Sequence, residues 1–209
     1  MINILLITLA ISLIYIGIAN RLSTCINLLA LQGIVLFGVS LIELIQINIV
    51  NLIFILFETI IFKTIAIPIF LKYIIKKNDI VRELEPYVPN FISLVIITAI
   101  IIGSFILSNN INDVHLRKMF FIVALSSLFT GLYMIISRKK IITHVIGYLI
   151  IENGVFVLAL SAGNKMPMLI NAGITLDIFA SILVLGIFIN KIGNTFEEMN
   201  ADNLTNLTD

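Results

Sequence analysis

Five ionisable side chains lie within stretches of the sequence that are otherwise almost entirely apolar: Glu58, Lys63, His144, Glu152 and Asp177. The clearest case is residues 149–160, LIIENGVFVLAL, where Glu152 and Asn153 stand alone among apolar neighbours. A carboxylate or a lysine at the centre of a membrane helix costs at least ~2.5–3.5 kcal/mol when it faces lipid. We therefore expect these acids to face the interior of a helix bundle, where they are protonated, paired or hydrated.

The spacing of the three acidic residues predicts that they lie at the same depth in the membrane. Glu58, Glu152 and Asp177 each lie twelve to fourteen residues from a lysine that marks one end of their apolar stretch. At 1.5 Å per residue, this places all three about 18–21 Å from the same face of the membrane, near its middle. Lys63 lies five residues, or about one and a half turns, from Glu58 on the same stretch. This spacing is not a direct i,i+4 pair, so we expect Lys63 to pair with another helix or another subunit.

A row of protonatable groups at this depth is what a proton relay requires. Burial raises the pKa of a carboxyl group and a nearby cation lowers it, so opposed effects keep such a group able to take up and release a proton. The alternative is structural, with buried polar side chains joining helices by hydrogen bonds. His144 lies eight residues before Glu152 and is either a proton-entry group or an interfacial histidine.

The composition indicates what must hold these groups in place. The 209 residues are 60% hydrophobic and 12% charged, with a mean hydropathy of +1.14. A soluble domain carries about a quarter charged residues, so the sequence predicts an all-α polytopic membrane protein. A net charge of +1 suggests no nucleic-acid partner, and a single cysteine, Cys25, excludes a disulfide framework or a CxxC pair within the chain.

About seven segments are long and apolar enough to cross a bilayer, and the first is interpreted as a transmembrane helix because it lacks the basic start of a signal peptide. The predicted spans are 2–19, 24–45, 49–75, 88–108, 117–137, 141–162 and 168–191. Nine lysines and arginines then fall on one side and three on the other, with Lys63 left inside a span. This imbalance predicts that the N-terminus is outside and the C-terminus cytoplasmic.

Proline and glycine residues predict local irregularities in these helices, and the sequence also contains a possible internal repeat. Pro68 should kink the third span, and the glycines near the acids (Gly147, Gly154 and Gly173) indicate either close helix packing or an unwound, hydrated turn. Aligning Gln32-Gly33 with Asn153-Gly154 gives an offset of 121 residues, and aligning Glu58 with Asp177 gives 119. Spans one to three and five to seven could therefore be parallel repeats, as in some transporters.

Three sequence features together resemble a known family. These are HVIGYLIIENGVFVLAL, the later INAGITLDIFASILVLGIFINKI with its mid-helix Asp177, and the ending DNLTNL; upstream, Lys63 is followed by Pro68. The set resembles component E of hydrogenase-4 and formate-hydrogenlyase-type complexes across nearly the whole chain. Residues 117–191 are similar to the three-helix K subunit of complex I and the C subunit of Mrp-type antiporters. Asp177 falls where the third-helix acid of that subunit belongs, and Glu152 lies about one turn from the second-helix position.

The resemblance implies a role and partners. It implies a multi-pass subunit in a prokaryotic cell membrane, within a complex related to group 4 [NiFe]-hydrogenases and complex I. Its partners would be antiporter-like membrane subunits and a peripheral module that carries the Fe–S clusters and the Ni–Fe centre, and this chain would hold no cofactor. It also divides the chain into a three-helix unit with a loop (1–87), a linking helix (88–116), a unit similar to the K subunit (117–192) and an acidic tail (193–209).

Other functions can be weighed against this one. A membrane cytochrome needs paired histidines within its spans, and only His144 lies in one. A retinal protein needs a central lysine in its last span, whereas the predicted span 168–191 has Asp177 and no central lysine. The sequence also contains no nucleotide-binding, zinc-binding or paired-cysteine motif, so catalysis by the chain alone is not expected. Two alternatives stay open: a free-standing cation/proton transporter in which Glu152 and Asp177 bind the ion, and a passive anchor in which the acids only pack.

Overall fold

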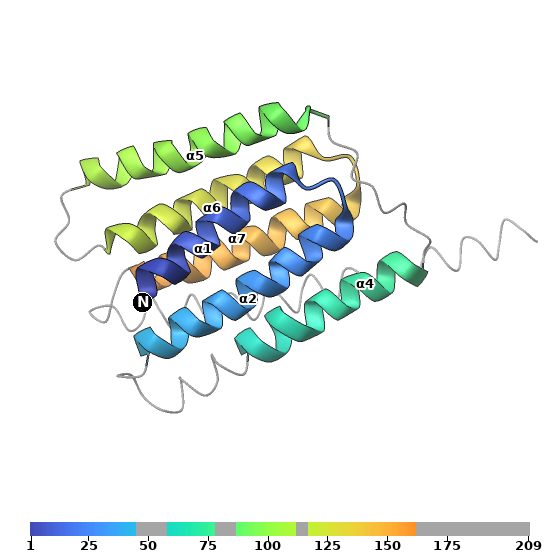
Figure 1. The fold of residues 1–209 in the computed structure, drawn as a ribbon, viewed down its shortest axis with the longest axis horizontal. Helices are drawn as coiled ribbons and strands as arrows, with labels where there is room; N and C mark the ends of the chain where they lie inside the picture. The colour runs from blue at the N-terminus through green and yellow to red at the C-terminus, as the bar shows by residue number, and fades with distance from the viewer. Residues whose placement is uncertain (45–57, 78–86, 112–116, 162–209) are drawn as a thin grey trace, which may run out of the picture.

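The computed structural model describes residues 1–44, 58–77, 87–111 and 117–161, and most of these residues are helical (Figure 1). The helices are α1 (Ile2–Ile18), α2 (Leu22–Leu44), η1 (Glu58–Ala66), α4 (Ile67–Lys77), α5 (Asn90–Asn110), α6 (Lys118–Ser137) and α7 (Ile141–Ser161). The all-α prediction is confirmed for this part of the chain. The predicted span at 168–191, with Asp177, lies outside the described residues.

Four of the described helices are long and apolar enough to cross a bilayer: Leu22–Glu43, Asn90–Asn110, Lys118–Ser137 and Ile142–Ser161. The first helix, Ile2–Ile18, is apolar but shorter. Together with the composition, these helices indicate a membrane protein. The total of seven spans and the direction of the chain across the membrane stay predictions.

The helices run side by side, and their directions alternate along the chain when η1 and α4 are taken as one continuous segment (Figure 1). Helices α6 and α7 pack most closely, because glycine faces glycine where they cross. A Cβ on Gly131 would lie 2.6 Å from the carbonyl oxygen of Gly147, and a Cβ on Gly147 would lie 2.8 Å from that of Gly131. Helix α5 lies at one side of the bundle against α1 and α6, and only 22% of its apolar window is buried.

The third predicted span is helical in the part described, but its winding changes within it. Residues Glu58–Ala66 form a π-helix, and an α-helix follows from Ile67. The Thr64 hydroxyl donates to the carbonyl oxygen of Thr59, five residues earlier, at 2.9 Å. Pro68 cannot donate a backbone hydrogen bond, and its ring would clash with the carbonyl of Thr64 in an unbroken α-helix. The wider winding before Pro68 relieves that clash, so the π-helix is how the segment accommodates Pro68. The kink expected at Pro68 stays a prediction.

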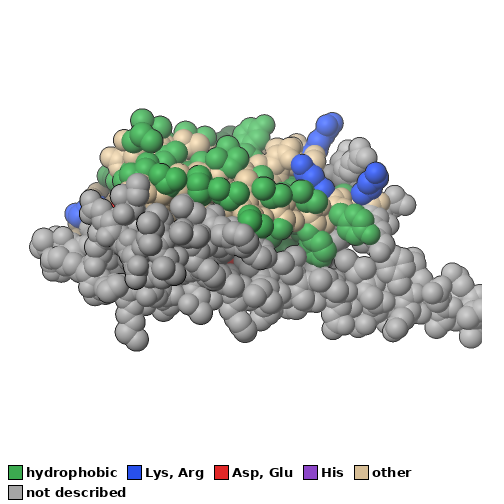
Figure 2. All heavy atoms as spheres, turned by 90° about the horizontal axis from the view of Figure 1, so that it is seen from below, with side chains coloured by type: hydrophobic (Ala, Val, Ile, Leu, Met, Phe, Trp, Pro, Cys, Tyr) green, Lys and Arg blue, Asp and Glu red, His purple; other side chains and the backbone are tan. Residues whose placement is uncertain are grey.

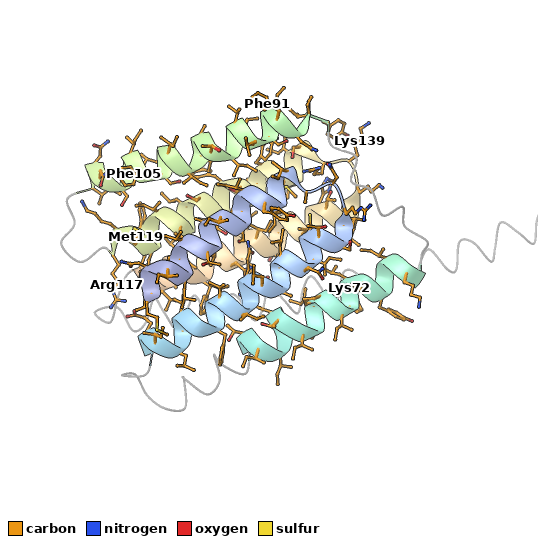
Figure 3. The ribbon with its side chains drawn as sticks, in the orientation of Figure 1. Lys72, Phe91, Phe105, Arg117, Met119 and Lys139 are labelled. Carbon is orange, nitrogen blue, oxygen red and sulfur yellow. The ribbon has the colours of Figure 1, made fainter. Side chains whose placement is uncertain are left out.

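The surface matches a bundle immersed in lipid. Large apolar side chains are exposed along the helices, for example Ile4, Ile11, Phe91 and Phe105. Figure 2 shows hydrophobic side chains covering the middle of one face, with Lys and Arg side chains toward its ends. Figure 3 places Lys72 and Lys139 at one end of the bundle and Arg117 at the other.

Candidate functional site

The side chain of Lys63 is buried in the middle of the bundle, with 5% of its surface exposed. It extends from η1 toward α7, where its Nζ donates to Oδ1 of Asn153 at 3.2 Å. The same Nζ lies 5.2 Å from the centre of the Phe156 ring, also on α7. A cation over an aromatic ring gains about 2 kcal/mol when desolvated. The prediction that Lys63 pairs with another helix is confirmed.

Asn153 belongs to a continuous chain of buried hydrogen bonds. Its Nδ2 donates to Oε1 of Gln32 on α2 at 3.0 Å, and Gln32 Nε2 donates to Oγ of Ser12 on α1 at 2.8 Å. The Ser12 hydroxyl donates to the backbone carbonyl of Leu9 at 2.6 Å. At most 5% of each of these side chains is exposed. One polar chain therefore joins η1, α7, α2 and α1 inside an apolar bundle.

Two glycines let the helices approach closely enough for this chain to form. A Cβ on Gly33 of α2 would lie 2.6 Å from Oγ1 of Thr64 and 3.1 Å from the backbone carbon of Lys63. A Cβ on Gly154 of α7 would lie 3.0 Å from the backbone nitrogen of Leu128 on α6. Gln32 and Asn153 each precede one of these glycines, so each amide extends from a point where two backbones nearly touch.

Of the two interpretations of the glycines, close packing is confirmed in the part of α7 that the structure describes. Helix α7 is continuous from Ile141 to Ser161, and both Gly147 and Gly154 pack directly against α6. The alternative of an unwound, hydrated turn at Gly147 or at Asn153-Gly154 is wrong. The pair Asn171 and Gly173, for which the same alternative applied, lies outside the described residues.

Glu152 precedes Asn153 in α7 and is buried, with 4% of its surface exposed. It lies near the middle of the helix, as its spacing from Lys140 predicted. His144 is half-buried in the first turn of the same helix, and its Nε2 lies 2.8 Å from the backbone carbonyl oxygen of Arg138. In this position His144 ties the start of α7 to the preceding connection. Whether it also admits protons stays a prediction.

The structure brings only some of the predicted residues together. Lys63 meets α7 within one residue of Glu152, whereas His144 lies two turns away along that helix. Glu58 is the first residue of η1, on the same helical segment as Lys63, and its side chain lies outside what the structure describes. Asp177 also lies outside the described residues. The common depth of the three acids therefore stays a prediction.

The sequence interpretation missed the roles of Ser12, Gln32 and Asn153. Gln32 and Asn153 had been noticed only as markers of the possible repeat, and a serine in an apolar helix carries no signal by itself. It also missed Arg138, which is 1% exposed and donates from Nη2 to the carbonyl oxygen of Gly17 at 2.7 Å. The hydrogen bonds between Gln32 and Asn153 and between Gly17 and Arg138 each join residues 121 apart, the offset of the proposed repeat.

Comparison with known proteins gives partial similarity to a hydrogenase component. Over 85 residues the chain is 31% identical to hydrogenase-4 component E of Escherichia coli (strain K12) and, equally, of Shigella flexneri. This similarity covers 41% of the chain and 39% of each relative, so the chain spans about two fifths of the length of those curated relatives. The resemblance expected over nearly the whole chain is therefore found over part of it.

A second similarity is longer and weaker. An uncharacterized protein of Mycobacterium tuberculosis (strain ATCC 25618 / H37Rv) is 23% identical over 193 residues, which cover 90% of this chain and 87% of that protein. No protein-family model and no solved structure matches the chain. Among the described residues there is no group of three or more His, Cys, Asp or Glu side chains placed to hold a metal ion.

Proposed function

We propose that this chain is a membrane subunit of a hydrogenase-related complex and that Lys63 and Glu152 lie on its path for translocated protons or sodium ions. The observation that supports this proposal most directly is the buried Lys63 on a π-helix. Its amine contacts Asn153 and Phe156 of α7, and Asn153 directly follows the buried Glu152 in the sequence. π-Helical turns occur frequently at functional sites. The partial similarity to hydrogenase-4 component E supports the choice of complex.

The energetics favour a functional role for these side chains. Placing a lysine or a carboxylate in the membrane interior costs about 2.5–3.5 kcal/mol for each group on insertion scales. An interhelical hydrogen bond in a membrane returns on average about 0.6 kcal/mol and at most about 1.7 kcal/mol. The contact with Phe156 offsets part of this cost for Lys63, but ionisable groups are still a costlier way to join two helices than neutral hydrogen-bonding residues. A structural role alone is better served by neutral polar residues such as Gln32 and Ser12.

The proposal includes partners that the resemblance implies. Antiporter-like subunits would continue the ion path, and a peripheral hydrogenase module would carry the Fe–S clusters and the Ni–Fe centre. Asp177 would contribute a further carboxylate at the depth of Glu152, and Glu58 would stand on the same helical segment as Lys63. This chain would perform no redox chemistry itself and would join the redox module to the pumping subunits.

The test separates ion pumping from assembly. Lys63→Met, Glu152→Gln and Asp177→Asn are introduced singly into the complex, and inverted membrane vesicles are assayed for redox turnover and for quenching of a pH-sensitive acridine dye. We expect the complex to assemble and turn over, while proton translocation per turnover falls about tenfold or more, as expected for a lost relay group. The matched control is Ser127→Ala, which removes a buried hydrogen bond of 2.9 Å to the carbonyl of Ile150 and no ionisable group.

Two results would contradict the proposal. Normal pumping by both Lys63→Met and Glu152→Gln would leave these residues as packing elements of a passive anchor. Isolation of the chain without hydrogenase-like subunits, together with ion transport by the purified chain in liposomes, would identify it as a free-standing transporter instead.

A further inference from the structure

We infer that Asn153, Gln32 and Ser12 are positioning residues for Lys63: they form a hydrogen-bond chain with a single direction that fixes which atom of Asn153 faces the lysine amine. The inference rests on the proposed function, because Lys63 is taken to act on the ion path. The three residues come from three helices other than the one that carries Lys63. They would not themselves exchange the translocated ion.

The direction of the chain follows from its two ends. The carbonyl oxygen of Leu9 can only accept, so the Ser12 hydroxyl uses its one hydrogen there, at 2.6 Å. Ser12 must then accept from Gln32, whose NH₂ group lies 2.8 Å away. The oxygen of Gln32 is left to accept from Nδ2 of Asn153 at 3.0 Å. The oxygen of Asn153 therefore faces Lys63, because a charged lysine amine can only donate hydrogen bonds.

This arrangement positions the amine and does not conduct protons. Asn and Gln side chains stay neutral over the whole physiological pH range, so the amides cannot relay a proton from Lys63 toward α1. The outer face of α1 carries exposed apolar residues, among them Ile7 and Ile11. The hydrogen-bond chain ends at a backbone carbonyl inside the bundle, before that face is reached. On this side, Lys63 is therefore held by neutral groups alone.

The experiment uses the assembled complex in inverted membrane vesicles and a pair of variants of nearly equal shape. Ser12→Thr keeps the hydroxyl and adds a methyl group, whereas Ser12→Val adds the same bulk without the hydroxyl. Gln32→Leu breaks the chain in its middle, and Ser127→Ala is the control for a buried interhelical hydrogen bond outside it. Redox turnover, proton translocation per turnover and the pH profile of translocation are measured for each variant.

We expect Ser12→Val and Gln32→Leu to lower proton translocation per turnover about threefold or more, because losing an orienting hydrogen bond of about 0.6 kcal/mol or more lets Asn153 turn its NH₂ group toward Lys63 in part of the population. The pH profile of translocation should also change its shape, because the amine is no longer held in one position. A merely structural role would lower translocation equally at every pH. Ser12→Thr and Ser127→Ala should pump like the unmodified complex, and redox turnover should persist in all four variants.

The outcomes separate the two proposals. If Lys63→Met abolishes pumping while Ser12→Val and Gln32→Leu pump normally, the positioning role is overturned and the proposed function stands. Equal losses in Ser12→Thr and Ser12→Val would also overturn it, because bulk rather than the hydroxyl would then be responsible. If Lys63→Met alone pumps normally, the positioning role is overturned; if Glu152→Gln pumps normally as well, the proposed function itself fails. Should Gln32→Leu not assemble, the two Ser12 variants decide the question.

Discussion

Arg138, just beyond the end of α6, carries a buried positive charge that is only partly satisfied. Its Nη2 donates to Gly17, whereas Nε and Nη1 have no hydrogen-bond partner in the part of the chain that the structure describes. Burial lowers the pKa of the Arg138 guanidinium, and electrostatic interactions with Cys25 and Tyr133 oppose that shift. The folded state thus disfavours the charge, so this arginine stabilises the bundle less than its burial suggests.

We expect Arg138→Met to leave the free energy of unfolding unchanged or to raise it by up to about 3 kcal/mol. The variant loses one charge-assisted hydrogen bond, which contributes about 1.5–3 kcal/mol, but also removes two unsatisfied nitrogens, Nε and Nη1, each of which costs about 1–3 kcal/mol. Arg138→Lys should be the more damaging change, by about 2 kcal/mol, because it keeps the buried charge and loses the planar fork that reaches Gly17. Thermal unfolding of the detergent-solubilised protein compares the two.

The exposed Lys139 supplies the control, since it contacts only the Tyr87 ring among the interactions described and Lys139→Met should lower the free energy of unfolding by no more than about 0.5–1 kcal/mol. A larger loss for Arg138→Met than for Arg138→Lys would show that the charge itself stabilises the fold.

The individual residues differ in how far the sequence predicts them. Lys63 and Glu152 could be expected in the interior because a charge inside an apolar span has few other places to go. The burial of Arg138 could not, because it lies in the run Arg138-Lys139-Lys140, and such runs usually mark a solvated helix end. Its burial depends on the position of the end of α1, where Gly17 accepts its hydrogen bond, and the sequence around Arg138 does not predict that position. The partner of Gln32 depends on tertiary packing in the same way.

At the scale of elements, the crossing of α6 and α7 depends on two glycines that face each other. A side chain on Gly131 would meet backbone atoms of α7: the Gly147 oxygen at 2.6 Å and the Ile151 nitrogen at 2.9 Å. Backbone cannot move aside as a flexible side chain can, so the helices would have to separate. Gly147 meets Gly131 and Ile135 in the same way, at 2.8 Å for the nearest atoms.

We therefore expect Gly131→Ala and Gly147→Ala each to destabilise the protein by about 1–3 kcal/mol. The double variant should cost less than the sum of the two, because the first substitution already opens the crossing that the second requires. Thermal unfolding in detergent measures all three variants. Gly103→Ala on α5 is the matched control, since nothing lies within 4 Å of a Cβ there, and it should be neutral or slightly stabilising. Equal effects at Gly103 and Gly131 would contradict this account.

The elements also show where sequence patterns stop being informative. Apolar runs of about 20 residues predict the existence of α2, α5, α6 and α7, and the structure agrees within a few residues at their ends. The π-helix around Lys63 is a different case. Pro68 predicts an irregularity, but kink, bulge and π-winding all accommodate a proline, and the choice depends on how α2 packs against the segment at Gly33.

For the whole molecule, the two hydrogen bonds that join residues 121 apart bear on the possible repeat. In parallel repeats related by a two-fold axis, equivalent residues that lie on the axis face one another. Gln32 faces Asn153, and Gly17 faces Arg138. An offset found first in the sequence thus recurs in two independent contacts between α1–α2 and α6–α7. This supports duplication, whereas the offset of 119 between Glu58 and Asp177 involves residues outside these contacts.

The distribution of basic residues predicts how the bundle is oriented in the membrane. The described lysines and arginines at the end of the bundle that holds Lys139 are Arg21, Lys72, Lys76, Lys77, Arg138, Lys139 and Lys140. Those described at the opposite end are Arg117 and Lys118. Loops rich in Lys and Arg stay in the cytoplasm, so the end that holds Lys139 should be cytoplasmic.

Cysteine labelling in intact cells tests this orientation directly. The chain has one cysteine, Cys25, which is fully buried and should not react with a membrane-impermeant maleimide. We expect Asn110→Cys, at the exposed end of α5, to be labelled from outside, and Lys139→Cys to be labelled only in inverted vesicles. The reverse pattern would invert the topology and place the charge-rich end outside. Labelling of both positions from one side would mean that α6 does not cross the membrane, and the assignment of Glu152 and Lys63 to mid-membrane depth would fall with it.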